Sequence, residues 1–446
     1  MNLGTGGSFA QMTLDSEASE GLPDNPTTFA GNMKLPIHRW FRYSAGFSAK
    51  WVEKTLGEIL EARGIRGDAC GDFVLLDPFA GSGTTLLEAD SAGVRGVGFE
   101  SHPLISRVAR AKLMWDTDAA EFRKFAGGIL ESARGPRGEV AEYPEVVYKC
   151  YTGAQLKQID ALRQTLRESE DESGLYCLSW LAFLSILRAA SHVGTAQWQY
   201  LLPNKSKSNV KSAFEAFDAQ VELMSRDIAA FQQKQKTKSA NPRSAALLHD
   251  SREAHHDFDN SVDLVITSPP YANNYDYADA TRLELCVLGE IGGWGDLHEA
   301  VRKNLIRSST QHVSRERKQT YEFLTAESLK PIKDEMFQVC KKLDAVKDLH
   351  GGKKNYHTMV ALYFLDLSKV IMNLRRMCKI GSDVCMVIGD SAPYGVYVPV
   401  DEWLGKLAAA SGFSSCSFIK NRDRNVKWKN RKHRIPLKEG QLWMKG

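Results

Sequence analysis

The sequence predicts an α/β fold, with a mostly parallel sheet, helices on both of its faces and a helical insertion. Short apolar runs typical of buried strands occur at 73–77, 95–99, 245–249, 262–266 and 383–388. Helical patterns separate several of these runs, and such alternation favours parallel strands joined by helices. The stretch between the second and third runs is too long for a simple crossover connection, which predicts the insertion.

Composition and pattern divide the 446 residues into three parts. Residues 1–31 are rich in Gly, Ser, Thr, Asp and Pro, so we expect a mobile tail. We expect 32–115 and 245–446 to form one discontinuous domain around the sheet. We expect 116–244 to be a helical insertion and a candidate substrate-recognition region. Its helical patterns occur at 152–168, 175–190 and 210–235.

The first strand-like run ends at Asp77 and leads into a glycine-rich loop, Pro-Phe-Ala-Gly-Ser-Gly, and a helical run from Thr84. Glycines at the carboxyl end of a strand let the backbone approach a ligand closely. Glu100 follows the second run, 23 residues after Asp77, and an acid at about 20 residues commonly binds ribose hydroxyls. The loop lacks the Gly-Lys-Ser/Thr ending of a phosphate-binding loop, which disfavours a nucleoside triphosphate.

The run 262–266 leads directly into Thr267-Ser268-Pro269-Pro270-Tyr271, the most informative segment of the chain. The two prolines fix φ and supply no N–H, so the turn is stiff and its carbonyls can accept hydrogen bonds. A tyrosine offers a stacking surface for a base taken out of a duplex. The turn therefore predicts a site for a planar base that bears an amine.

Together these segments resemble the S-adenosylmethionine-dependent amino-methylating DNA methyltransferases. The segment 77–83 is similar to their cofactor loop, and Thr267-Ser268-Pro269-Pro270-Tyr271 is similar to their catalytic motif. The Ser-Pro-Pro-Tyr form is most common among cytosine-N4 enzymes, whereas adenine-N6 enzymes more often carry Asp or Asn first. The segment 38–44, followed by a helical run from Ala49, is similar to the one that packs over the methionine end of the cofactor.

The resemblance implies a Rossmann-like methyltransferase fold, whose seven-stranded sheet ends in an antiparallel hairpin of the runs 414–419 and 441–444. It implies S-adenosyl-L-methionine as cofactor and no metal. In the catalytic motif, Ser268 and the carbonyl of Pro269 would accept the amine N–H groups, Pro270 would stiffen the turn and Tyr271 would stack on the base. The implied cofactor-binding residues are Phe41, Asp77, Phe79, Ala80, Gly81, Gly83, Thr84, Glu100, Asp250 and Ser251.

Three polar features leave alternatives open. Asp250 fits either a contact to the cofactor adenine or a strand-end turn. Asp390, after the run 383–388, fits either a substrate contact or a loop. The run 203–209, with Lys205 and Lys207, fits either a substrate-binding surface or a solvated loop. Separately, the basic stretch 290–355 is a second candidate recognition region.

A dense basic segment joins the two C-terminal strand-like runs. Eight Lys and Arg residues occur within 420–434, with Asp423 as the single acid. Neutralisation of phosphates by such side chains is the usual source of nucleic-acid affinity, although a solvated basic loop has the same composition. The predicted nucleic-acid-binding residues are Arg424, Lys427, Lys429, Arg431 and Lys432.

Composition excludes several other classes. The net charge of +4 is too small to indicate nucleic-acid binding by itself. The eight cysteines form no Cys-x-x-Cys pair, which argues against a zinc site and a disulfide framework. None follows a proline, which separates the chain from cytosine-C5 enzymes and their Pro-Cys nucleophile. No signal peptide or membrane span is visible, so we expect a cytoplasmic protein.

The sequence thus predicts a site-specific methyltransferase that modifies the N4 amine of a flipped-out cytosine in double-stranded DNA. A cognate restriction endonuclease or another defence-system component is the candidate partner. An adenine-N6 enzyme and an RNA amino-methyltransferase are the alternatives within the same fold. A protein methyltransferase or a non-catalytic cofactor-binding module would be the alternative from another class.

Overall fold

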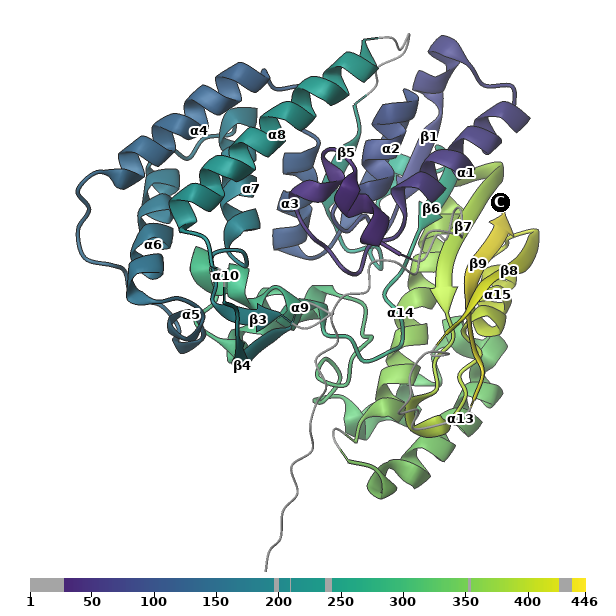
Figure 1. Ribbon diagram of the computed structural model, residues 1–446. Helices are drawn as coiled ribbons and strands as arrows, with labels where there is room; N and C mark the ends of the chain where they lie inside the picture. Colours follow the sequence, from purple (N-terminus) through teal and green to yellow (C-terminus); the bar gives the residue numbers. More distant parts are fainter. Residues whose placement is uncertain (1–27, 196–199, 209, 237–242, 352–353, 425–434) are drawn as a thin grey trace, which may run out of the picture.

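The structure is a computed structural model that describes residues 28–446 except 196–199, 209, 237–242, 352–353 and 425–434. Its centre is a seven-stranded sheet in the order β5-β2-β1-β6-β7-β9-β8 (Figure 1). The strands are β1 Val74–Asp77, β2 Arg95–Glu100, β5 Ala245–Leu248, β6 Val262–Thr267, β7 Cys378–Gly389, β8 Ser415–Arg424 and β9 Leu437–Lys445. Neighbours among β5, β2, β1, β6 and β7 are parallel, and β9 is antiparallel to β7 and β8. The predicted fold class, including its C-terminal hairpin, is confirmed.

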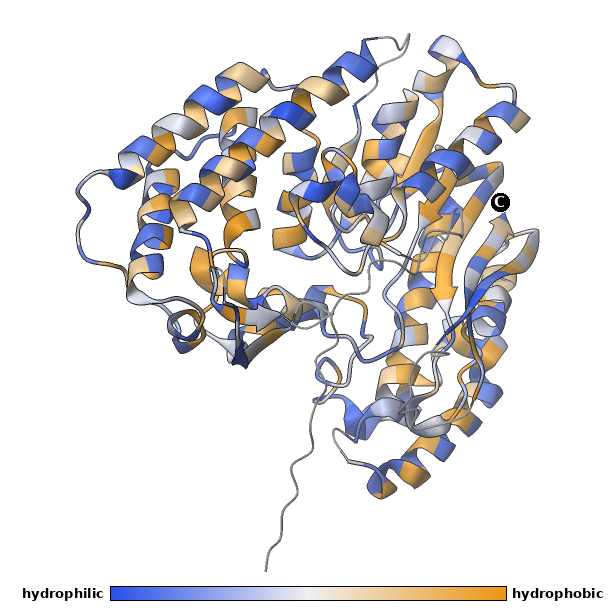
Figure 2. Ribbon diagram, in the orientation of Figure 1, coloured by the Kyte–Doolittle hydropathy of each residue, from blue (hydrophilic) through white to orange (hydrophobic). Residues whose placement is uncertain are grey.

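Helices cover both faces of the sheet. Successive side chains of a buried strand point to opposite faces, so each strand contributes to two hydrophobic clusters. In β1, Leu75 packs in one cluster with Val52 and Leu56, whereas Leu76 packs in another with Phe364. Both leucines are fully buried. Figure 2 shows the central strands mostly in the hydrophobic colour, as expected for a sheet covered on both sides. The helices that pack around the sheet are α1 Ala49–Ala62, α2 Thr84–Ala92, α3 Pro103–Lys112, α13 Lys333–Val346, α14 Tyr356–Met377 and α15 Val400–Ala410.

Strand β7 begins earlier than the run 383–388 that the sequence predicts. The helix α14 ends at Met377, and β7 begins at the next residue. Gly381 lies inside β7 with φ of +79°, a conformation that glycine adopts without a steric penalty. The register with β6 shifts across this stretch, so Gly381 forms an irregularity in the strand.

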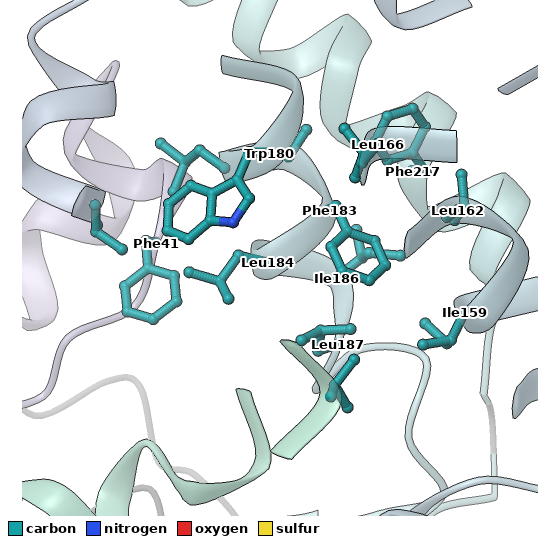
Figure 3. Close-up of a cluster of buried hydrophobic side chains, with 14 of the residues drawn as sticks. Phe41, Ile159, Leu162, Leu166, Trp180, Phe183, Leu184, Ile186, Leu187 and Phe217 are labelled. Atoms are coloured by element: carbon teal, nitrogen blue, oxygen red, sulfur yellow. The ribbon is translucent and has the colours of Figure 1, made fainter. Parts of the chain in front are cut away.

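The described part of 116–244 contains five helices that pack side by side in a lobe beside the sheet (Figure 1). They are α4 Ala119–Arg134, α5 Glu145–Cys150, α6 Gly153–Glu168, α7 Gly174–Ile186 and α8 Ala213–Gln235. Figure 3 shows the core of this helical lobe, where Phe183 lies among Leu162, Ile186 and Phe217. Two short antiparallel strands also lie here, β3 Val193–Thr195 and β4 Leu201–Ser206, so the run 203–209 begins in a strand rather than in a loop.

Shorter elements complete the described chain. Most of the expected tail, 1–27, lies outside the described residues, and Phe29 is buried just before a 3-10 helix, η1 Ala30–Lys34. A second 3-10 helix, η2, spans His38–Trp40. Among the described residues, no helix is both long and apolar enough to span a bilayer. The short α-helices on either side of 300 are α9 Tyr277–Ala280, α10 Arg282–Leu288, α11 Leu297–Ala300 and α12 Thr320–Phe323.

Candidate active site

The glycine-rich loop and the catalytic turn leave the sheet side by side, because β1 and β6 are parallel neighbours. Asp77 ends β1, and its Oδ1 accepts a hydrogen bond of 2.6 Å from Oγ1 of Thr267, the last residue of β6. The same carboxylate accepts from Oγ1 of Thr85 at 2.7 Å and from the N–H of Phe79 at 3.0 Å. Burial raises the pKa of Asp77 to about 6. Asp77 therefore fixes the two loops relative to each other.

Glu100 closes the other side of the glycine-rich loop. Its two carboxylate oxygens accept from the N–H groups of Gly81 at 2.9 Å and His102 at 2.8 Å. Gly81 has φ of +53°, and a Cβ added there would lie 3.0 Å from Cε1 of Tyr43. The ring of Tyr43 thus packs directly on the glycine backbone, which any side chain would prevent. Burial raises the pKa of Glu100 to about 7.

One pocket unites the predicted cofactor loop with the predicted catalytic turn. Of the predicted site residues, seven line it: Phe79, Ala80, Gly81, Thr84, Glu100, Ser268 and Pro270. The other ten lining residues are not among the site residues predicted from the sequence: Tyr43, Ala45, Gly46, Phe47, Ser82, Ser101, His102, Tyr277, Leu305 and Ile306. From the segment 38–44, Tyr43 lines this pocket.

Phe41 does not line this pocket. It is 6% exposed and packs into the core of the helical lobe, where Figure 3 shows it beside Leu184 and near Trp180. Its side chain therefore anchors the segment 38–44 to the lobe, and the next aromatic residue, Tyr43, reaches the pocket.

Four other predicted cofactor residues lie next to the loop without lining the pocket. Asp77 lies beneath the loop, and Gly83, with φ of +85°, packs against Ala109 of α3. Oγ of Ser251 donates to the carbonyl of Pro78 at 2.5 Å, so it supports the loop from the β5 side. The carboxylate of Asp250 forms an ion pair with Arg252 at 2.6 Å.

Two hydrogen bonds to neighbouring elements hold the catalytic turn. Oγ of Ser268 donates to the carbonyl of Val387 in β7 at 3.2 Å. The hydroxyl of Tyr363 in α14 donates to the carbonyl of Pro270 at 2.9 Å. Because a serine hydroxyl has one hydrogen, Ser268 can act only as an acceptor toward a ligand while this bond is kept. The turn therefore presents an acceptor to the pocket.

Tyr271 is fixed from two sides. Its hydroxyl donates to Oε1 of Glu439 in β9 at 2.9 Å. The guanidinium of Arg424, at the end of β8, lies 5.2 Å from its ring centroid and donates to the carbonyl of Asp390 at 2.8 Å. Burial raises the pKa of Tyr271 well above its usual value. Arg424, predicted to contact phosphates, thus packs on the motif tyrosine in this structure.

The other predicted nucleic-acid-binding residues cannot be placed in the same way. The side chains of Lys427, Lys429, Arg431 and Lys432 lie outside the described residues. Asp390, a candidate substrate contact, is 2% exposed, and its Oδ2 accepts from the hydroxyl of Tyr397 at 2.7 Å. Its carboxylate therefore lies in a polar contact within the protein and is not part of the pocket lining.

The pocket suits a nucleoside that carries a positive centre. The carboxylate of Glu100 can accept from the vicinal hydroxyls of a ribose and favours a nearby cation. The exposed backbone of Gly81 allows close approach, and the rings of Tyr43 and Phe79 supply apolar walls. S-adenosylmethionine combines these features, so the residues present fit it. In the described part of the chain, no three His, Cys, Asp or Glu side chains gather to hold a metal ion.

Comparison with curated proteins gives matches along most of the chain. It is 25% identical over 422 residues to the Type II methyltransferase M.AvaI of Nostoc sp., a match that covers 89% of this chain and 83% of that protein. M.AvaI of Anabaena variabilis gives the same values. The Type II methyltransferase M.BsoBI of Geobacillus stearothermophilus is 25% identical over 433 residues, with 89% and 82% covered. The chain is a relative of the Type II methyltransferases.

The methyltransferase match spans more than the sheet. The matches cover 89% of this chain, and the part that they leave uncovered is shorter than the segment 116–244. The matched part therefore includes residues of the helical lobe. The predicted resemblance is therefore confirmed as a relationship to methyltransferases. No family model matches the chain, and no solved structure matches it.

Proposed function

We propose that the chain transfers a methyl group from S-adenosyl-L-methionine to the exocyclic N4 amine of a cytosine flipped out of double-stranded DNA. The observation that carries this proposal is the shared pocket. Ser268 and Pro270 of the catalytic turn line the same cavity as Gly81 and Glu100 of the cofactor loop. A donor held by the loop and an amine held by the turn would therefore meet without either segment moving far.

The catalytic turn supplies hydrogen-bond acceptors, which is what an aromatic amine needs. The lone pair of such an amine is delocalised into the ring, so the nitrogen is a poor nucleophile. Ser268 has already given its hydrogen to Val387 and can accept one N–H of the base. The carbonyl of Pro269 would accept the other, as the resemblance implies. Two such bonds favour a pyramidal nitrogen whose lone pair points at the donor.

The cofactor loop supplies position. When bound, S-adenosylmethionine provides an electrophilic methyl group on a cationic sulfur. Glu100 would hold the ribose hydroxyls, Gly81 would allow the backbone to approach, and Tyr43 would cover the methionine end. The residues of this chain then contribute mainly by aligning two reactants, a contribution worth several kcal/mol.

Tyr271 would support the base by stacking, although Arg424 covers part of its ring in this structure. Stacking of a base on an aromatic side chain is worth about 1–3 kcal/mol. The base would take the face of the ring opposite Arg424 or displace the guanidinium. The phosphates of the duplex would be bound by the basic segment 420–434.

Duplex DNA is thus the proposed substrate, and the Type II names of the relatives support a restriction–modification setting with a cognate endonuclease as partner. The polymer can be tested by incubating purified protein and labelled S-adenosylmethionine with mixed-sequence duplex DNA or with total RNA. We expect label in DNA. Label in RNA alone would select the RNA amino-methyltransferase, and label in neither, with cofactor bound, would favour a protein substrate or a binding module.

A further inference from the structure

A buried carboxylate in the helical lobe holds the segment that leads to the cofactor pocket. Asp227 lies on α8 and is 2% exposed. Its Oδ2 accepts from the N–H of Ile37 at 3.2 Å and from Nε1 of Trp40 at 3.0 Å. Arg39 binds both of its oxygens, from Nε at 2.9 Å and from an Nη at 2.5 Å. One side chain of the lobe therefore receives four hydrogen bonds from residues 37–40.

The backbone held in this way is strained. Ile37 has φ of +64° and ψ of −49°, and the N–H of His38 donates to the carbonyl of Pro36 at 2.7 Å. These values describe a γ-turn of the rare, strained form. A β-branched residue at positive φ costs of order 1–3 kcal/mol and persists only when its surroundings enforce it. Asp227 binds the N–H of the strained residue itself.

The strained turn sets the direction of the chain toward the pocket. Two more hydrogen bonds fix the segment 37–43 to the lobe. The carbonyl of Trp40 accepts from Oγ of Ser185 at 2.6 Å and from Nε2 of Gln220 at 3.3 Å. Tyr43 follows and packs its ring on Gly81 at the pocket wall. The position of this wall therefore depends on the helical lobe.

We propose that Asp227 is a positioning residue for the cofactor pocket, acting through the segment 37–43 on Tyr43. The inference rests on the proposed use of S-adenosylmethionine. The helical lobe, the candidate recognition region, thereby becomes part of the cofactor site, and a displacement of α8 would change cofactor affinity.

A matched control lies in the same lobe. Asp160 of α6 is also 2% exposed and also receives four hydrogen bonds from nearby donors. The donors are Ala141 N, Tyr143 Oη, Arg163 Nη2 and Gln164 Nε2. All of them belong to the lobe, and none belongs to the segment 37–43. Replacing Asp160 by Asn therefore removes a comparable buried carboxylate without touching the pocket wall.

The test measures the dissociation constant for S-adenosylmethionine by calorimetry, together with the melting temperature, for the full chain and two variants. We expect Asp227→Asn and Asp160→Asn both to lower the melting temperature. Asp227→Asn should weaken cofactor binding about tenfold, because it loses charged hydrogen bonds to the segment, whereas Asp160→Asn should leave it within about twofold. Equal effects of the two variants on binding would overturn the proposal.

A milder variant covers the case in which Asp227→Asn does not fold. The side chain of Arg39 is one-third exposed, so Arg39→Gln removes the bidentate contact at little cost to the core. We expect it to weaken cofactor binding about threefold and to lower the melting temperature, because the buried carboxylate of Asp227 loses its cation, and unchanged binding would count against the proposal. A wild-type chain that binds no S-adenosylmethionine would instead refute the proposed function.

Discussion

The hydroxyl of Tyr271 donates to Oε1 of Glu439, and this bond joins the catalytic turn after β6 to strand β9. Glu439 is 3% exposed and also binds Arg422, through Nε at 2.9 Å and through an Nη at 2.8 Å. A buried carboxylate thus orients the ring that the proposed reaction needs for stacking. Because Arg422 and Arg424 lie where the basic segment begins, the same carboxylate links the base site to the candidate phosphate-binding segment.

Tyr271→Phe separates orientation from stacking. The ring remains and the bond to Glu439 is lost, so we expect kcat for DNA to fall about three- to tenfold, with cofactor affinity unchanged. Tyr271→Ala removes the ring as well and should cost about 1–3 kcal/mol more in kcat/KM. Steady-state kinetics with duplex DNA measure both. If Phe and Ala were equally harmful, the hydroxyl rather than the ring would carry the function.

Ser268→Ala and Gly81→Val should affect different steps. Ser268→Ala removes an acceptor for the base amine, so we expect a methylation rate lower by about 10- to 100-fold and nearly unchanged cofactor binding. Gly81→Val places a branched side chain at positive φ and against the ring of Tyr43, so it should abolish cofactor binding. Single-turnover rates and calorimetric titration with S-adenosylmethionine distinguish the two. Equal loss of cofactor binding in both variants would show that these roles are not separate.

Glu100 should make cofactor binding pH-dependent. Burial raises its pKa from an ordinary value of 4.5 to about 7, so it carries a proton in the free protein below that pH. In the proposed function, the ionised form would accept the ribose hydroxyls and favour the cationic cofactor. Affinity should therefore rise with pH up to about 7, by as much as about tenfold per pH unit, and then level off. Titrations with the cofactor between roughly pH 5.5 and 8.5 measure this dependence, because that range lies on both sides of the pKa of Glu100.

The isosteric variant Glu100→Gln should bind weakly and without this dependence. A wild-type profile as flat as that of the variant would argue against the role of Glu100.

The basic segment should control the salt dependence of DNA binding. Charge reversal at Lys427, Lys429, Arg431 and Lys432 should weaken binding, and the slope of log K against log salt should fall by up to about 0.9 for each phosphate that is no longer neutralised. Fluorescence anisotropy at several salt concentrations measures this slope. A control that exchanges Lys and Arg at the same positions keeps the charge and should behave like the wild type. Unchanged affinity after charge reversal would assign the segment to solubility alone.

The sheet and the two motifs could be predicted from sequence because they depend on local patterns. The runs that became β1, β2 and β6 are apolar and end in the motif residues, and parallel strands place those ends at one edge. The helix Tyr356–Met377 follows its apolar periodicity over its full length. Such elements need no knowledge of distant contacts.

Other features depend on contacts between residues far apart in the chain. Tyr43 rather than Phe41 lines the pocket. Asp227 binds the segment 37–40 and the lobe core holds Phe41, and these contacts fix the direction in which the chain continues to Tyr43. Arg424 belongs to a basic run, yet Tyr271 and Asp390 determine where it packs. Asp250 pairs with Arg252, a neighbour that a strand-end pattern does not reveal as its partner. The sequence shows which residue types are present, whereas these pairings follow from the tertiary fold.

In the proposed function, one pocket brings a cofactor methyl group to the N4 amine of cytosine. The most direct measurement is mass analysis of nucleosides from mixed-sequence duplex DNA after incubation with deuteromethyl-labelled S-adenosylmethionine. We predict labelled N4-methylcytosine from the wild type and a strongly reduced amount from Ser268→Ala. Labelled N6-methyladenine would contradict the assigned base while keeping the site, and unlabelled DNA, from a protein shown to bind the cofactor, would contradict the claim itself.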